Sequence, residues 1–227
     1  MKRVCFVSAL LFIGSANAQW ENPVDRYANE YKNHVSASCP IPDDHIKHFV
    51  YFARDREAIK HHPLLTQPSF QGAQIMYSWA MLEPEKDRYD FSLVQADYEY
   101  LKNHGKKLFI QLQDATFNPA YKGVPKYLLS ETYSGGVAKQ LTDDGKHEGW
   151  VAKRWDSNVQ ERFAKLLNAL GKEFDGKIEG INLQETAAGA SQAEDFTEAG
   201  YIGGIKANML ASNTLFQIQV PCNMRTL

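Results

Sequence analysis

The sequence predicts an α/β protein in which short parallel strands alternate with amphipathic helices. Apolar runs of strand length recur along the chain, and the stretches between them have helical spacing and start with a helix-capping pattern. Repeated strand–helix–strand order implies parallel strands joined by right-handed crossovers. The runs are apolar without strict alternation, which is typical of strands covered on both faces.

The first 18 residues have the pattern of a signal peptide rather than of a folded element. Lys2 and Arg3 precede the apolar run Val4–Gly14, and Ala16–Ala18 forms a small-x-small cleavage site. We therefore expect a mature chain that begins at Gln19 and is secreted or periplasmic. The alternative is an N-terminal membrane anchor, but the run is short for a dedicated span. No later segment is apolar for long enough to cross a membrane.

Residues 19–45 are expected to form an irregular lead-in, because Trp20–Pro42 is polar and rich in proline. From residue 46 to residue 227 the pattern is that of one barrel-like domain. Five strands are expected, namely Ile46–Phe52, Ala73–Trp79, Lys107–Gln113, Ile178–Gln184 and Thr214–Val220.

Four helical stretches are expected between these strands. Asp55–His62 is helical and stops before Pro63. Three further helices open with the capping-box spacing, in which a serine accepts from a free backbone N–H and a Gln or Glu three residues on reaches back. They start at Ser92 with Gln95, at Ser157 with Gln160 and at Ser191 with Glu194, and they end near His104, at Gly171 or Gly176, and near Ala211.

Two architectures fit this order of elements: a barrel of eight strand–helix units and an open, doubly wound sheet. No Gly-rich phosphate loop follows the first strand, which argues against the nucleotide-binding version of the open sheet. The connection Asp114–Trp155 is much longer than usual and leaves the carboxyl end of the third strand. Loops of this length usually form lids or binding walls.

Composition narrows the classes of partner. The chain has 25 basic and 27 acidic residues, and the signal segment holds Lys2 and Arg3 but no acid, so the mature chain keeps 23 basic residues and a net charge of −4. There is no basic stripe, so nucleic acid is not expected as a partner. The 12% aromatic content suits ligands whose rings stack, such as carbohydrates. Cys39 and Cys222 are either bridged or free, and no spacing indicates a metal site.

The stretch Lys177–Ala187 (KIEGINLQETA) carries the most chemical information. Its apolar strand ends on Glu185, with the amides of Asn182 and Gln184 beside it. A carboxylate just past the carboxyl end of a buried strand is where α/β barrels place catalytic groups. The alternative is a surface glutamate near the Ser191 helix.

Three motifs resemble the retaining glycoside hydrolases with a (β/α)8 barrel, the clan that includes cellulases, xylanases and β-galactosidases. Tyr77–Phe91 (YSWAMLEPEKDRYDF) resembles the second strand of that clan, Gly105–Gln113 (GKKLFIQLQ) the third and Gly180–Thr186 (GINLQET) the fourth. The resemblance extends from Ile46 to Gln219. It implies a partial TIM (β/α)8 barrel with about the first five units of eight, Glu185 as the acid/base and no cofactor.

Two departures from the clan pattern matter. The clan usually has Asn directly before the acid/base glutamate, where this chain has Gln184, with Asn182 two residues earlier. The clan's nucleophile lies on the seventh strand, and this sequence offers no residue for that role. A retaining glycosidase needs both carboxylates, about 5–5.5 Å apart, so we expect the chain alone to be nearly inert.

The candidate sugar-binding residues each have a second interpretation. Trp79 is a stacking platform or a core residue. Asp114 binds a hydroxyl or closes a turn. Trp155 lines a subsite or packs under the long connection, as does Trp150. Arg54 is a candidate for a hydrogen bond in the pocket. The carboxylates of Glu83 and Glu85 are interpreted as turn residues before the Ser92 helix.

Three functional hypotheses follow. The chain is an exported glycosidase, or the N-terminal part of one, that acts on an oligo- or polysaccharide; it is a non-catalytic carbohydrate-binding remnant; or it is an inactive, truncated product. An unclosed barrel exposes two sheet edges. We therefore expect marginal stability, aggregation or dependence on a complementary C-terminal fragment.

Overall fold

The structure is a computed structural model that describes residue 32, residues 46–184 and residues 189–215. The chain divides into two units, residues 1–46 and 47–227, and the description below concerns the second. The expected signal peptide, the lead-in except residue 32, Cys39, Cys222 and Glu185 lie outside the described residues. Within the described residues, no helix combines the length and the apolar character that a membrane span requires.

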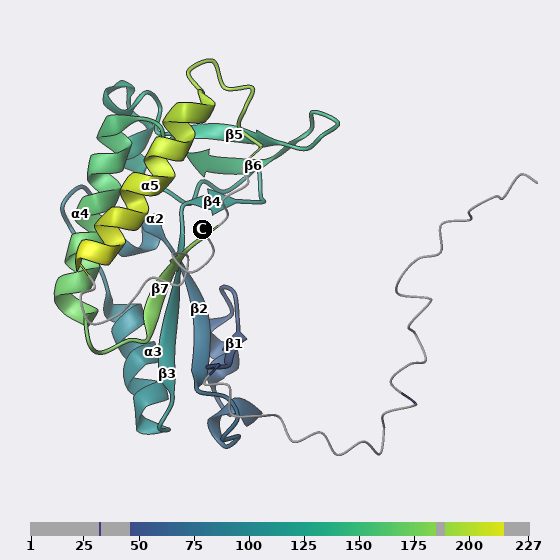
Figure 1. Ribbon diagram of the computed structural model, residues 1–227, viewed down its shortest axis with the longest axis vertical. Coiled ribbons are helices and arrows are strands. Elements are labelled where there is room, and N and C mark those ends of the chain that lie inside the picture. Colours follow the sequence, from purple (N-terminus) through teal and green to yellow (C-terminus); the bar gives the residue numbers. More distant parts are fainter. Residues whose placement is uncertain (1–31, 33–45, 185–188, 216–227) are drawn as a thin grey trace, which may run out of the picture. The chain divides into compact units, whose positions relative to one another are not determined.

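A parallel sheet of four strands forms the centre of the fold (Figure 1). The strands lie side by side in sequence order: β1 (Phe49–Tyr51), β2 (Gly72–Ser78), β3 (Lys107–Gln113) and β7 (Gly180–Leu183). Each neighbouring pair is parallel, and Ile75 of β2, Ile110 of β3 and Ile181 of β7 share one register row. The first four expected strands and their parallel arrangement are confirmed.

The two faces of this sheet differ, which corrects the expectation of strands that are apolar on both faces. One face carries buried apolar side chains at alternate positions, namely Ala73, Ile75, Tyr77, Leu108, Ile110, Leu112 and Ile181. The positions between them carry the partly buried amides of Gln74, Gln111 and Asn182, together with the apolar Met76, which is buried, and Phe109, which is partly buried. The strands therefore alternate in part, because the second face mixes amides with Met76 and Phe109 rather than being apolar throughout.

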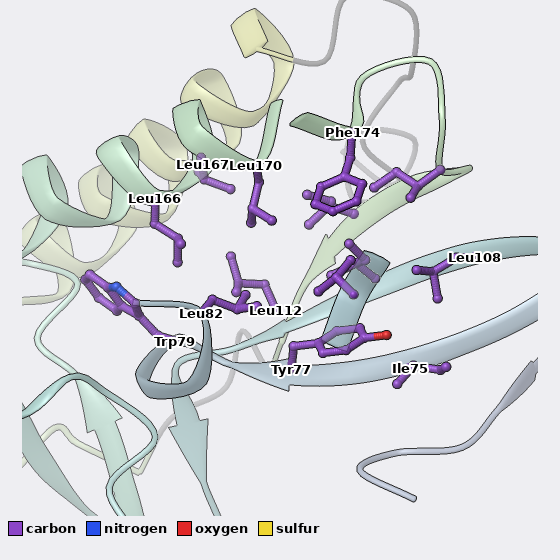
Figure 2. Packing of buried hydrophobic residues seen from close by; sticks show 14 of the residues in the cluster. Ile75, Tyr77, Trp79, Leu82, Leu108, Leu112, Leu166, Leu167, Leu170 and Phe174 are labelled. Carbon is purple, nitrogen blue, oxygen red and sulfur yellow. The ribbon is translucent and has the colours of Figure 1, made fainter. Parts of the chain in front are cut away.

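The helices α3 (Ser92–Asn103) and α4 (Ser157–Phe174) cover the apolar face. Figure 2 shows Leu166, Leu170 and Phe174 of α4 directed at the sheet, where Tyr77 and Leu112 meet them. The helix α5 (Glu198–Leu215) lies beside α4 (Figure 1). The hydrophobic core is thus the layer between the sheet and these helices.

The helix starts are set by other residues than the expected serines. Phe91 is the N-cap of α3, and Asp90 Oδ1 accepts from Ser92 N at 3.0 Å, so Ser92 is inside the helix. Asp156 is the N-cap of α4, because its Oδ1 accepts from Asn158 N at 2.9 Å and from Val159 N at 3.0 Å. An aspartate one or two residues upstream supplies the acceptor in both cases, so both expected capping boxes are wrong.

The last helix begins later and ends later than expected. Residues 191–197 form turns, and Thr197 Oγ1 accepts from Gly200 N at 3.1 Å near the start of α5. The helix then continues through Thr214 and Leu215. The expected fifth strand, Thr214–Val220, is therefore wrong at its first two residues, and its other residues lie outside the described part of the chain.

The long connection after β3 has a sheet of its own. Its antiparallel strands have the order β4-β6-β5 and are β4 (Ala115–Thr116), β6 (His147–Ala152) and β5 (Val137–Leu141). Two 3-10 helices, η4 (Lys126–Leu129) and η5 (Glu131–Tyr133), precede β5. Gly149 permits the close approach of β6 to β4, because a Cβ there would lie 1.7 Å from the carbonyl oxygen of Thr116.

Short helices complete the first units. The expected helix Asp55–His62 is the 3-10 helix η2 (Arg56–Ile59), followed by η3 (Pro63–Leu65). The helix α2 (Trp79–Leu82) follows β2 directly. At the opposite, amino-terminal edge of the sheet, Glu179 binds Lys107 Nζ at 2.7 Å and also Lys47.

Candidate functional site

The carboxyl ends of β2, β3 and β7 meet at one edge of the parallel sheet, and the candidate site lies there. The backbone pairing continues one residue past β7, because Gln184 N donates to the carbonyl oxygen of Leu112 at 3.3 Å. Glu185 is the next residue in the chain and lies outside the described residues. The strand that leads to the expected acid/base is thus in register with its neighbour up to the residue before it.

Two side-chain hydrogen bonds cross the polar face of the sheet. Tyr51 OH on β1 donates to Gln111 Oε1 on β3 at 2.7 Å. Gln74 Nε2 on β2 donates to Asn182 Oδ1 on β7 at 3.1 Å. Each bond joins strands that are separated by one other strand. Asn182, expected to bind sugar, is therefore held by Gln74 on a partly exposed face rich in amides.

The polar face could have been identified from the sequence. In KLFIQLQ the residues at positions 109, 111 and 113 fall on one side of a strand, and in GINLQ the amides at positions 182 and 184 do the same. Amide groups both donate and accept hydrogen bonds, as sugar hydroxyls do. An interpretation of the strands as apolar runs misses three polar residues, namely Gln74, Gln111 and Tyr51.

Gln113 and Gln184 occupy the strand ends and are buried, with exposed fractions of 1% and 8%. Among the described residues, neither Oε1 atom has a hydrogen-bond partner. Buried acceptors of this kind normally find a donor. Gln184 is therefore consistent with its expected role beside the acid/base, and Gln113 is a further candidate for contact with a hydroxyl.

Asp114 is engaged in a buried ion pair rather than available to a sugar. Its Oδ2 accepts from Arg154 Nε at 2.7 Å and its Oδ1 from Arg154 Nη2 at 2.7 Å. Both side chains are nearly inaccessible, with exposed fractions of 3% for Arg154 and 4% for Asp114. The expectation that Asp114 binds a hydroxyl is not what this geometry provides, because the carboxylate is buried and both of its oxygens face Arg154.

Trp79 belongs to the core, which decides between the two interpretations of this residue in favour of packing. Its side chain is 0% exposed and meets the ring of Phe163 edge-on at a centroid distance of 5.1 Å. Its Nε1 donates to Glu83 Oε2 at 2.8 Å. Figure 2 shows the indole directed toward α4. A fully buried indole has no free face for a pyranose.

Glu83 lies in the turn before the Ser92 helix, as expected, but its carboxylate is buried. It is 0% exposed, and its Oε1 accepts from Asp87 N at 3.1 Å and from Arg162 Nη2. Arg162 Nε donates to Tyr127 OH at 2.9 Å. Burial tends to lower the pKa of Arg162, but its bonds to Asp87, Tyr127 and Glu83 outweigh burial and raise it. Glu83 therefore joins the end of α2 to α4.

The remaining candidates lie at the edge of the site. Trp155 is half-buried and meets the rings of Phe196 at 5.1 Å and Tyr201 at 6.3 Å. It also packs against a small buried cluster that includes alanine and valine side chains of the long connection. Arg54 is exposed and lies over the ring of Tyr121 at 5.1 Å. Burial raises the pKa of the Tyr51 hydroxyl, and the nearby Arg54 partly offsets that effect.

A hollow of about 850 Å³ lies between the turn after α2 and the start of the long connection. Its lining includes Pro84, Tyr121, Lys122, Pro125 and Tyr127. Within the described residues, no group of three or more His, Cys, Asp or Glu side chains is arranged to hold a metal ion. The described side chains at this edge include amide and phenol groups.

No family model matches the chain, and no curated protein matches it. Among solved structures, it is similar to an exo-β-1,4-mannosidase from Opitutaceae bacterium strain TAV5, with 15% identity and a TM-score of 0.50 over 76% of this chain and 30% of that chain. An endo-glycoceramidase II from Rhodococcus sp. follows with 16% identity and a TM-score of 0.49 over 76% of this chain and 46% of that one.

A GH1 β-glucosidase from Exiguobacterium antarcticum B7 is also similar, with 12% identity and a TM-score of 0.46 over 72% of this chain and 33% of that one. The chain spans 30% to 38% of the length of the first three such structures. These neighbours are glycoside hydrolases with TIM-barrel catalytic domains. At this level of identity the likeness to the mannosidase, with its TM-score of 0.50, shows the fold alone, and the expected partial (β/α)8 barrel is confirmed.

Proposed function

We propose that this chain carries the acid/base half of an exported, retaining glycoside hydrolase that acts on an oligo- or polysaccharide. The observation that supports it is the position of Glu185 in the chain, directly after the backbone pairing of β7 with β3. In α/β barrels, residues at the carboxyl ends of strands carry the chemistry. The amide-rich face of the same sheet suits a ligand with many hydroxyl groups.

In the proposed reaction, Glu185 protonates the leaving glycosidic oxygen while a second carboxylate attacks the anomeric carbon. The glycosyl–enzyme bond is then hydrolysed by water that Glu185 deprotonates. The resemblance assigns the nucleophile to a seventh strand, and none of this sequence's residues matches it. The proposed active enzyme therefore needs a further barrel segment that supplies this carboxylate about 5–5.5 Å from Glu185.

The amides have a binding role in this proposal. Gln184 and Gln113 present buried side-chain oxygens at the ends of neighbouring strands, and Asn182 is oriented by Gln74. Each can hydrogen-bond to a hydroxyl group of the bound sugar. The reaction class uses two carboxylates and requires no cofactor.

The experiment begins with the longest continuous reading frame that contains this sequence. Its product is expressed and assayed with nitrophenyl glycosides and with oligosaccharides. We expect turnover with retention at the anomeric carbon, whereas residues 19–227 alone give little or none. A longer frame that encodes no strand-end carboxylate, or a product with inversion, would contradict the proposal.

Glu185→Gln is the variant that tests the assigned residue. Loss of a general acid lowers rates by about 10²–10⁴-fold. The loss is expected to be smaller for dinitrophenyl glycosides, because their leaving group needs no proton. Glu99→Gln is the matched control, since Glu99 is exposed on α3 and binds only Gln95 among its side-chain partners in the described residues. Equal activity of the two variants would exclude Glu185 as the acid.

The second hypothesis is that the chain is a non-catalytic carbohydrate-binding remnant. Residues 19–227 and the longer product also test this hypothesis. Two results together would favour this hypothesis: saturable binding when residues 19–227 are titrated with oligosaccharides, and the absence of any longer active product. The burial of Trp79 weakens the hypothesis of a binding remnant, because that hypothesis relied on Trp79 as the stacking platform. The N-terminus of the exported protein is checked separately by mass spectrometry of the intact protein, with Gln19 as the expected first residue.

A further inference from the structure

Arg154 connects three parts of the structure at the carboxyl edge of the sheet. Besides its two bonds to Asp114, which follows β3, its Nη2 donates to the carbonyl oxygen of Gln184 at 3.2 Å. Its Nη1 donates to Tyr201 OH on α5 at 2.9 Å. One buried guanidinium therefore ties the end of β7 to the end of β3 and to a helix.

The carbonyl group of Gln184 belongs to the peptide bond between Gln184 and Glu185. A donor that fixes this carbonyl limits rotation of the backbone at the point where the proposed acid/base begins. The neighbouring N–H of Gln184 is held by Leu112 at the same time. The N–H and the C=O of Gln184 are thus both held, the first by the sheet and the second by Arg154.

The guanidinium is suited to this task because its donors are fixed in a planar fork and its charge is permanent. Burial alone would lower the pKa of Arg154, but the charge and hydrogen bonds of Asp114 and the hydroxyl of Tyr201 outweigh burial and raise it. A lysine at this position has one nitrogen and could not reach Asp114, Gln184 and Tyr201 together.

We propose that Arg154 is the positioning residue of the proposed acid/base: it holds the backbone carbonyl of Gln184, which directly precedes Glu185 in the chain, in place against Asp114 and Tyr201. The inference rests on the function proposed for Glu185. Arg154 acts through this carbonyl group and is assigned no contact with the sugar.

Hydrogen exchange measured by mass spectrometry on the purified chain tests this without any need for turnover. Arg154→Lys is compared with Arg162→Lys, a matched control in which the arginine is equally buried but bonds to Glu83, Asp87 and Tyr127 instead. We expect Arg154→Lys to speed exchange in peptides that cover residues 180–186 by roughly tenfold or more beyond any global change. Equal exchange of these peptides in the two variants would overturn the proposal.

A milder variant keeps the test decisive if Arg154→Lys does not fold. Tyr201→Phe removes one hydroxyl from a partly buried residue, and the loss of one neutral hydrogen-bond partner is expected to speed the same exchange by about two- to tenfold. Unchanged exchange in Tyr201→Phe would count against the proposal. In an active longer product, Arg154→Lys should lower kcat with little change in KM. Arg162→Lys should not lower kcat selectively in this way.

The failures of the two proposals are distinguishable. If Glu185→Gln leaves turnover intact, the proposed function fails whatever the exchange data show. If Glu185→Gln abolishes turnover but Arg154→Lys exchanges like Arg162→Lys, only the positioning role of Arg154 fails.

Discussion

Trp79 offers the sharpest test of the packing described above, because the sequence left open whether it is a core residue or a sugar platform. Its indole is inaccessible, packs on Phe163 and donates to the buried carboxylate of Glu83 at 2.8 Å. The perturbation is Trp79→Phe, which keeps an aromatic ring but removes the donor and part of the volume.

The expected loss of stability follows from these contacts. A hydrogen bond to a charged group contributes about 1.5–3 kcal/mol. The smaller ring adds a cavity term, so we expect a total loss of about 2–4 kcal/mol in the free energy of unfolding. That is a large fraction of the roughly 5–15 kcal/mol available to a typical domain.

The assay is urea denaturation of the purified chain, followed by circular dichroism and fluorescence. Trp150→Phe is the control, because Trp150 is only partly buried and its Nε1 donates to the carbonyl oxygen of Pro119 at 2.8 Å near the surface. We expect this control to lose less than about 1 kcal/mol. A Trp79→Phe variant as stable as wild type that had lost sugar binding would refute the core assignment.

Three further predictions concern stability. Arg162→Met should destabilise the fold by about 3–5 kcal/mol because it leaves the carboxylate of Glu83 buried without its cation, whereas adding Glu83→Leu should recover much of that loss in urea denaturation. Asp156→Ala should cost about 1 kcal/mol by removing the cap of α4, whereas Ser157→Ala should be nearly neutral in thermal melts. Burial alone would raise the pKa of Glu179, but its two lysine partners outweigh burial and lower this pKa below the usual 4.5. The ion pairs of Glu179 therefore stabilise the fold fully above pH 4.5, and this stabilisation is lost as the pH falls through the lowered pKa. Glu179→Gln should therefore flatten part of the acid limb of a stability–pH profile.

Each of these has an outcome that contradicts it. If the double variant Arg162→Met/Glu83→Leu is less stable than Arg162→Met alone, the loss of stability does not come from an unpaired Glu83 carboxylate. Equal losses for Asp156→Ala and Ser157→Ala would restore the serine as the cap. An acid limb identical in wild type and Glu179→Gln would mean that the carboxyl titrates normally in the folded state.

The sequence predicts the parallel sheet well because its signal is local. Lys107–Gln113 is a continuous strand pattern between Gly105 and a change in composition, and its bounds agree with the structure to the residue. Helix starts are harder, because several nearby side chains can cap the same turn. Asp156 and Ser157 are adjacent candidates, and only the backbone conformation at Asp156 decides between them.

The site was predicted less well than the fold, because it depends on partners far apart in sequence. Asp114 meets Arg154 forty positions later, and Glu83 meets Arg162 seventy-nine positions later. Nothing in the local sequence indicates that these charges pair in the interior. The end of α5 shows the opposite problem, since Thr214 and Leu215 resemble the start of a strand but continue the helix already formed.

The two hydrogen bonds across the polar face have a consequence for barrel closure. In a complete (β/α)8 barrel, interior side chains stack in layers, and each layer takes its members from alternate strands. Tyr51 with Gln111 joins the first and third strands, and Gln74 with Asn182 joins the second and fourth. Each bonded pair is therefore half of one layer. Strands that complete these layers should bring polar groups, because the usual Val, Ile and Leu offer no partner to the amide donors and acceptors that these two bonds do not use.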